Sequence, residues 1–181
     1  VFPSAPYGYR NKLQLPVRTV NGKVVLGFFR SNSHDVVPTD ECAIQAGGAK
    51  KIIAFFKKFL QENDLSAYDE ATKKGLLRHI VVRCYDGEYL FTLVTKSGKI
   101  NCVNRLIDGL IEEFGEKISV VRNINDSSSN VILGDKSEVL YGSGFIRICE
   151  EGVKYEVGTY SFMQVNNEVK RKIYEDVVSL G

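Results

Sequence analysis

Hydrophobic and polar residues alternate along several stretches of the chain, which predicts antiparallel strands. Over residues 12–30, apolar side chains alternate with polar ones, and Asn21-Gly22 in the middle is typical of a type I′ turn. Asp86-Gly87 lies in the same way between the strand-like runs 80–84 and 89–95. Both stretches are therefore expected to form β-hairpins.

Other stretches space their apolar residues three and four apart, as helices do. The pattern predicts helices over residues 44–61, 103–114 and 168–180. Gly47-Gly48 weakens the first turns of the first helix, so its regular part is expected to begin near Ala49. The last helix has an apolar face that it cannot bury without a partner.

The order of these elements indicates the fold class. Helix, strand, strand, helix and a further strand at 118–122 follow one another, which is the ferredoxin-like order when a first strand precedes them. Three short strands, 138–141, 145–149 and 153–160, are then expected to form a C-terminal β-meander. The sequence thus predicts an α+β fold with antiparallel sheets and three helices.

Composition places the chain among ordinary globular proteins. It has 181 residues, of which 44% are hydrophobic and 25% charged, and no apolar run approaches the roughly 20 residues that a membrane helix needs. We expect one large domain, a monomer, without a membrane partner. The first residues are Val1-Phe2-Pro3 rather than Met, so we expect a fragment of a longer protein.

The distribution of basic residues says more than the net charge of +2. One basic group comes before the first acidic residue, Asp35, and a second follows residue 72. The two groups are Arg10, Lys12, Arg18, Lys23 and Arg30, and Lys73, Lys74, Arg78, His79 and Arg83. Tyrosines next to the first group suit stacking on unpaired RNA bases. Solvated strand edges explain the same residues equally well.

No complete catalytic set is visible, because neither histidine has a Ser or Cys placed to form a triad. The cysteines contain no Cys-x-x-Cys pair, so a self-contained zinc site is not expected. We expect them to be reduced thiols, with Cys84 and Cys149 in strands. Cys42 differs, because it lies in a polar segment just before a predicted helix. Phe162 and Gln164, in a turn between a strand and the last helix, suit stacking and hydrogen bonding to a base or cofactor.

A series of short blocks resembles the bacterial RNA (uracil-5-)-methyltransferases, and their order along the chain is more specific than any single block. The blocks are Tyr9-Arg10-Asn11-Lys12, Gly27-Phe28-Phe29-Arg30, Ser33-His34-Asp35-Val36-Val37, Cys42-Ala43-Ile44-Gln45, Tyr68-Asp69-Glu70, Gly75-Leu76-Leu77-Arg78-His79, Asn123-Ile124-Asn125, Asn130-Val131-Ile132-Leu133-Gly134, Leu140-Tyr141-Gly142 and Ser161-Phe162-Met163-Gln164-Val165-Asn166. The resemblance covers nearly the whole chain and is nearest to the ribosomal RNA branch. Met163 departs from the common Phe or Ile, which is a hydrophobic exchange.

The resemblance implies a cytoplasmic enzyme that transfers a methyl group from S-adenosylmethionine to C5 of a flipped-out uridine in ribosomal RNA. It implies that residues 1–160 are the central domain and that 161–181 are a signature turn and the start of a linker helix to the cofactor domain. The nucleophilic cysteine and the base would belong to that further domain. The fragment alone is therefore expected to be inactive and free of cofactor.

The resemblance also implies roles for particular residues. Gln164 and Phe162 would lie at the cofactor and target base, and Cys42 would be the fourth ligand of a four-iron–four-sulfur cluster, which one thiolate alone cannot hold. The residues expected to contact RNA are Arg10, Lys12, Arg30, Arg78 and His79. The competing hypotheses are a stand-alone RNA-binding or adapter domain without catalysis, and a structural domain whose basic surface is incidental.

Overall fold

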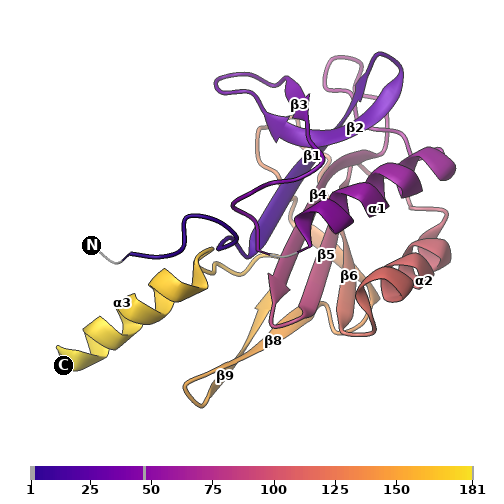
Figure 1. Ribbon diagram of the computed structural model, residues 1–181. Helices are drawn as coiled ribbons and strands as arrows, with labels where there is room; N and C mark the ends of the chain where they lie inside the picture. The colour runs from indigo at the N-terminus through magenta and orange to yellow at the C-terminus, as the bar shows by residue number, and fades with distance from the viewer. Residues whose placement is uncertain (1–2, 47, 181) are drawn as a thin grey trace.

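The computed structural model describes residues 3–46 and 48–180 and confirms an α+β fold with three helices in that part of the chain. The elements in chain order are β1 (Lys12–Val20), β2 (Lys23–Phe29), β3 (Val36–Pro38), α1 (Ala49–Glu62), β4 (Leu77–Tyr85), β5 (Glu88–Thr95), α2 (Val103–Phe114), β6 (Ile118–Ile124), β7 (Lys136–Tyr141), β8 (Phe145–Glu150), β9 (Val153–Gly158) and α3 (Asn167–Ser179). Figure 1 shows their arrangement.

The first seven strands form one sheet in the order β3-β2-β1-β4-β5-β6-β7. Every neighbouring pair is antiparallel except β5 and β6, which are parallel and are joined by α2, because parallel neighbours need a crossover connection. The predicted helix and strand order is therefore present. The strands are not interleaved as in a split βαβ unit, since β5 and β6 are direct neighbours.

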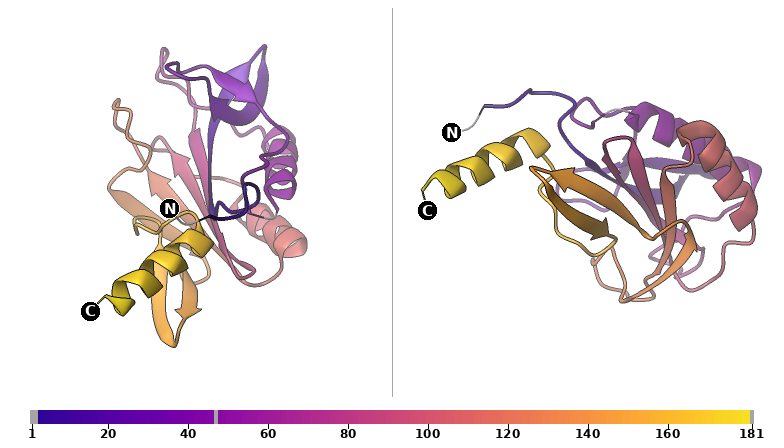
Figure 2. Two further views of the ribbon diagram at one scale, coloured as in Figure 1. Left: turned by 60° about the vertical axis from the view of Figure 1, so that its left-hand side comes forward. Right: turned by 90° about the horizontal axis from the view of Figure 1, so that it is seen from below.

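The molecule has three layers, with the sheet in the middle (Figure 2). Helices α1 and α2 cover one face, where Ile53, Phe56 and Phe91 are among the fully buried core residues. The β8–β9 hairpin packs on the other face and forms a smaller core around Ile146 and Ile148.

Both predicted tight turns are confirmed. Asn21 and Gly22 have φ angles of 51° and 76°, and Asp86 and Gly87 have 48° and 74°. Positive φ at both central positions defines the type I′ turn, and the twist of that turn matches the twist of the strands it joins.

Helix α1 begins at Ala49, as expected from the glycines, and not at Ile44. Gly48 precedes it as the N-cap residue with φ 95°, outside the right-handed helical region. Gly47, the other glycine of the pair, lies outside the described residues. Residues 44–46 instead run beside the N-terminal segment, which places them at the candidate site.

The last three strands pair differently from the expected meander. β7 joins the large sheet through β6, whereas β8 and β9 form a separate hairpin. The chain between β7 and β8 turns at Gly142 and Gly144, which have φ 73° and 80°, and the Ser119 hydroxyl accepts hydrogen bonds from the backbone N–H groups of Ser143 and Gly144. This turn leads the hairpin onto the second face, where its apolar side chains are buried.

Helix α3 projects from the body of the molecule, close to the N-terminal segment (Figure 1). Lys170 is its only buried residue among those described, and Ile173 and Val177 on its apolar face are 37% and 63% exposed. None of the described helices is long and apolar enough to cross a membrane.

Candidate functional site at the turn before the last helix

Three segments that lie far apart in the sequence meet just before the start of β1. They are the turn over residues 161–167, the N-terminal segment 8–12 and the loop 42–46. The backbone N–H of Arg10 donates to the carbonyl of Ile44 (2.8 Å), and that of Asn11 donates to the carbonyl of Val165 (2.9 Å). The blocks that carry the sequence resemblance at both ends of the chain thus belong to a single structural unit.

Asn11 is the residue that joins these segments. Its side chain is buried, and its amide nitrogen donates to the carbonyl of Gln164 (3.0 Å) and to the side-chain oxygen of Asn167 (2.6 Å). Its own side-chain oxygen has no partner in the described part of the structure. Since a buried amide with two such bonds is costly to move, Asn11 fixes the backbone at Gln164.

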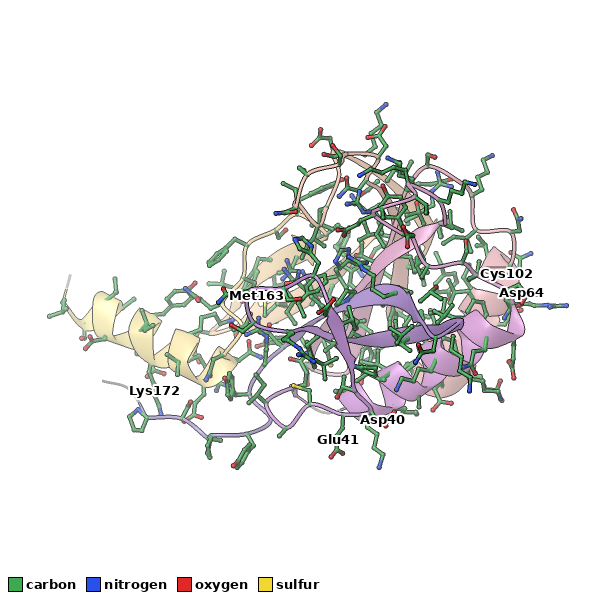
Figure 3. The ribbon with its side chains drawn as sticks, turned by 90° about the horizontal axis from the view of Figure 1, so that it is seen from above. Asp40, Glu41, Asp64, Cys102, Met163 and Lys172 are labelled. Carbon is green, nitrogen blue, oxygen red and sulfur yellow. The ribbon has the colours of Figure 1, made fainter. Side chains whose placement is uncertain are left out.

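The start of the turn is held by the sheet. The guanidinium of Arg83 on β4 donates to the carbonyl of Ser161, and the Thr92 and Thr159 hydroxyls lie 3.3 Å apart. Met163 packs against the core below the β8–β9 hairpin, and Figure 3 shows it close to the base of α3. The turn is therefore anchored on both sides of Phe162 and Gln164.

Phe162 and Gln164 themselves point away from these anchors. Phe162 is 86% exposed, and the Gln164 side chain is also exposed and makes no hydrogen bond within the described residues. An aromatic ring can stack on a flat ligand, and a free amide offers one acceptor and two donor hydrogens. A rigid backbone carrying two unused side chains is typical of a ligand-binding turn.

Basic residues beside the turn lack acidic partners. Lys12 and Arg83 are opposite each other on β1 and β4, and Arg10 lies next to them. Burial, followed by the charges of Arg83 and Arg10, lowers the pKa of Lys12, and burial lowers the pKa of Arg83. Among the described residues, none of the three forms a salt bridge. This uncompensated positive charge favours an anion such as a phosphate.

The turn leads directly into α3, whose first residues are also fixed. The side-chain oxygen of Asn166 caps the helix by accepting from the backbone N–H of Val169 (3.0 Å). One turn later, the buried Lys170 ammonium lies 2.6 Å from the Glu150 carboxylate and over the rings of Tyr85 and Tyr155. We call Lys170, Glu150, Tyr85 and Tyr155 the Lys170 cluster.

The Lys170 cluster predicts a pH dependence of stability. Burial raises the pKa of Glu150, but hydrogen bonds from Lys170, Tyr155 and Tyr85 outweigh it and lower that pKa from 4.5 to about 2. A lowered folded-state pKa means that the stabilisation is complete above 4.5 and is lost as the pH falls towards 2. We expect the unfolding free energy of the wild type to fall over this interval more steeply than that of Glu150→Gln, measured by urea titration. Equal slopes would contradict the assignment.

The remaining residues expected to contact RNA lie elsewhere on the structure. Arg30 is exposed at the end of β2. Arg78 and His79 are only 4% and 5% exposed; Arg78 donates to the carbonyls of Asn125 (2.9 Å) and Ser127 (2.6 Å). Their burial argues against the expected direct contact with phosphate, because both side chains lie below the surface. Residues Leu77–Val82 belong to a strand that is buried on both faces. Recognising such a strand in the sequence would have predicted that Arg78 and His79 are buried.

Cys42 lies in the loop beside the N-terminal segment and is partly buried, and all four cysteines are free thiols. Cys84 and Cys149 are in strands, as predicted, although Cys149 is exposed. The described residues contain no group of three or more His, Cys, Asp or Glu side chains that could hold a metal ion. One thiolate does not fit a four-iron–four-sulfur cluster on its own.

The chain resembles known proteins in sequence and in fold. No family model matches the chain. An uncharacterized RNA methyltransferase of Streptococcus pyogenes is 39% identical over 178 residues, which are 97% of this chain and 38% of that protein. An uncharacterized RNA methyltransferase of Streptococcus agalactiae is also 39% identical, over 97% of this chain and 40% of its own length.

Among solved structures, the tRNA (uracil-54, C5)-methyltransferase of Pyrococcus abyssi, in complex with S-adenosyl-L-homocysteine, matches with a TM-score of 0.75 and 25% identity. The match covers 96% of this chain and 41% of that one. The chain therefore spans about two fifths of the length of the relatives it matches. The sequence resemblance to RNA methyltransferases is confirmed by these relatives along nearly the whole chain.

Proposed function

We propose that this chain, which is related along nearly its whole length to RNA methyltransferases, is the RNA-contacting part of an enzyme that methylates C5 of a uridine in ribosomal RNA. The observation that carries the proposal is the turn over residues 161–167, in which a locked backbone presents the free side chains of Phe162 and Gln164. In such an enzyme the methyl donor is S-adenosylmethionine. The bound S-adenosyl-L-homocysteine of the Pyrococcus relative supports this choice of cofactor.

The residues of the site divide into two proposed roles. Gln164 would hydrogen-bond the cofactor or the target base, and Phe162 would stack on the base, because both side chains are exposed and unpaired. Arg10, Lys12 and Arg30 would contact phosphates, and none of the three forms a salt bridge with a described residue. Methylation at C5 requires the uridine to leave its stack, so a projecting aromatic ring beside the site suits a flipped base.

The nucleophile and the base would lie outside residues 161–167 and outside the strands beside them. The cofactor would supply an electrophilic methyl group, and the residues of this chain would bind and orient the RNA against it. The chain would thus contribute substrate binding and one side of the active site, and helix α3 would connect this part to the cofactor domain.

The test is a methylation assay with the protein expressed from its complete reading frame. The protein would be incubated with labelled S-adenosylmethionine and either ribosomal RNA fragments or tRNA transcripts, and the product nucleosides analysed by mass spectrometry. We expect 5-methyluridine in ribosomal RNA, and no product when the target uridine is replaced by cytidine. Product in tRNA alone would overturn the substrate assignment, and RNA binding without any methylated product would support the binding-domain hypothesis.

We also propose that Cys42 becomes an iron–sulfur ligand together with three cysteines outside the described residues. The position of Cys42 supports this, since its loop is held against the N-terminal segment by a hydrogen bond from Gly8 to the carbonyl of Ala43 (2.9 Å). Iron and acid-labile sulfide would be measured in the complete protein and in Cys42→Ser, with Cys149→Ser as the control. Equal iron in all three proteins would overturn this assignment.

A further inference from the structure

Phe29, at the end of β2, is an aromatic ring that the fold leaves partly uncovered. It is 39% exposed, although it sits in a strand whose inner residues are buried. The guanidinium of Arg18 lies over the ring, 5.3 Å from its centroid. The rings of His34 and His79 stand at 68° and 66° to it, with centroids 6.1 and 6.2 Å away.

The groups around Phe29 hold the ring in one orientation. Arg18 donates to the Glu70 carboxylate (2.6 Å) and to the carbonyl of Val17 (2.9 Å), and the same carboxylate lies 3.4 Å from His34. Burial, followed by the charges of Arg18 and Arg78, lowers the pKa of His79 to about 3, so the buried imidazole is neutral. Phe29 therefore rests on a fixed support and needs little ordering to receive a ligand.

A second cationic side chain follows Phe29 in the sequence. Arg30 follows Phe29 directly, is exposed, and forms no salt bridge with any described residue. Arg18 and Lys12 alternate onto the same face of β1, and at ~3.3 Å per residue they lie about 20 Å apart. An RNA strand lying along this face passes both Phe29 and the turn that carries Gln164.

We propose that Phe29 is a stacking platform for an unpaired RNA base, with Arg30 contacting the adjacent phosphate. The inference rests on the proposed RNA-binding function and adds a second contact, separate from Phe162. An exposed aromatic ring with one cation over it and another next to it in the sequence suits a base attached to a phosphate, because the base stacks and the phosphate needs positive charge. A purely apolar protein partner would leave the positive charge of Arg30 without an opposite charge.

The experiment measures binding of a short uridine-rich single-stranded RNA to the chain by fluorescence anisotropy over a series of salt concentrations. Because stacking of one base is worth about 1–3 kcal/mol, Phe29→Ala is expected to weaken binding by about 5- to 140-fold. The slope of log affinity against log salt should stay unchanged in that variant. Arg30→Gln should instead reduce the slope by about 0.7, the value for one phosphate contact on a single strand.

Further variants separate stacking from packing. Phe29→Trp should retain affinity, and Phe29→Leu should lose it although it keeps an apolar side chain; thermal unfolding would show that each variant is folded. Tyr174→Ala, which removes an exposed aromatic ring on α3, is the matched control and should bind as the wild type does. Salt-dependent binding that Phe29→Ala leaves unchanged, or that Phe29→Leu retains, would overturn the platform alone. Absence of binding by the wild type at low salt would overturn the RNA-binding function as well.

Discussion

Replacing Lys170 with methionine is expected to lower the free energy of unfolding by about 3–5 kcal/mol, because it leaves the Glu150 carboxylate buried without its cationic partner. The Lys170 side chain is 2% exposed and that of Glu150 is 12% exposed, so water cannot replace the lost ion pair. Two tyrosine hydroxyls still donate to Glu150, which keeps the loss near the lower end of this range. Urea unfolding followed by tyrosine fluorescence measures the change, since Tyr85 and Tyr155 report on the cluster directly.

Lys172 on the same helix provides the control. It forms an i, i+4 pair with Glu168 at 2.7 Å, but both side chains are solvent-accessible, and Figure 3 shows Lys172 on the side of α3 near the N-terminal segment. Lys172→Met should therefore change stability by less than about 0.5 kcal/mol. A double variant, Glu150→Leu with Lys170→Met, should recover much of the loss because no buried charge remains. If Lys170→Met were no more destabilising than Lys172→Met, the cluster would not be what anchors α3.

The parts of the fold that the sequence predicted are those that depend on local chemistry. Asn21-Gly22 and Asp86-Gly87 favour one turn type whatever surrounds them, and Gly48, with its positive φ, precedes the first residue of α1. The apolar spacing of α2 likewise gave Val103–Phe114 without reference to the rest of the chain.

Strand pairing depends on partners that are distant in sequence, and there the prediction failed. Nothing within Lys136–Tyr141 itself identifies its partner, which is the buried strand β6 and not the next strand, β8. The pairing of these strands depends on Ser119 of β6. Its hydroxyl accepts hydrogen bonds from the backbone of the turn between β7 and β8. A sequence pattern does not reveal such a hydrogen bond.

The candidate site shows the same division. Phe162 and Gln164 were predicted from a motif, but the residues that hold them, Asn11 and Arg83, were not assigned to the site. Asn11 was part of a quoted block, yet its role follows only from the meeting of residues 8–12 with the turn. Arg78 and His79 were assigned to the surface from charge alone, whereas the structure buries them. Charge in a strand predicts exposure poorly when the strand lies in the centre of a sheet.

The position of Asn11 leads to the second large effect, which concerns the methyl transfer proposed for the complete protein. Asn11→Ala removes the two hydrogen bonds that hold the Gln164 carbonyl and Asn167, and it leaves the partly buried Gln164 carbonyl without this donor. Displacement of a positioned group by about 1 Å can cost about 100-fold in rate, so we expect a loss of that order in kcat. Asn11→Asp should be at least as harmful, since it places a second acceptor against the Gln164 carbonyl and the Asn167 side-chain oxygen.

A double-mutant cycle distinguishes this positioning role from general destabilisation. If Asn11 acts through Gln164, then Gln164→Ala should lower the rate to a similar extent, and the double variant should be little worse than either single one. Gln14→Ala, which removes a partly buried amide from the adjoining strand β1, is the control and should retain activity. Independent, multiplying losses from Asn11→Ala and Gln164→Ala, with equal thermal stability, would show that Asn11 does not work by holding the turn. Coupled losses would tie the N-terminal block of the chain to the chemistry at its other end.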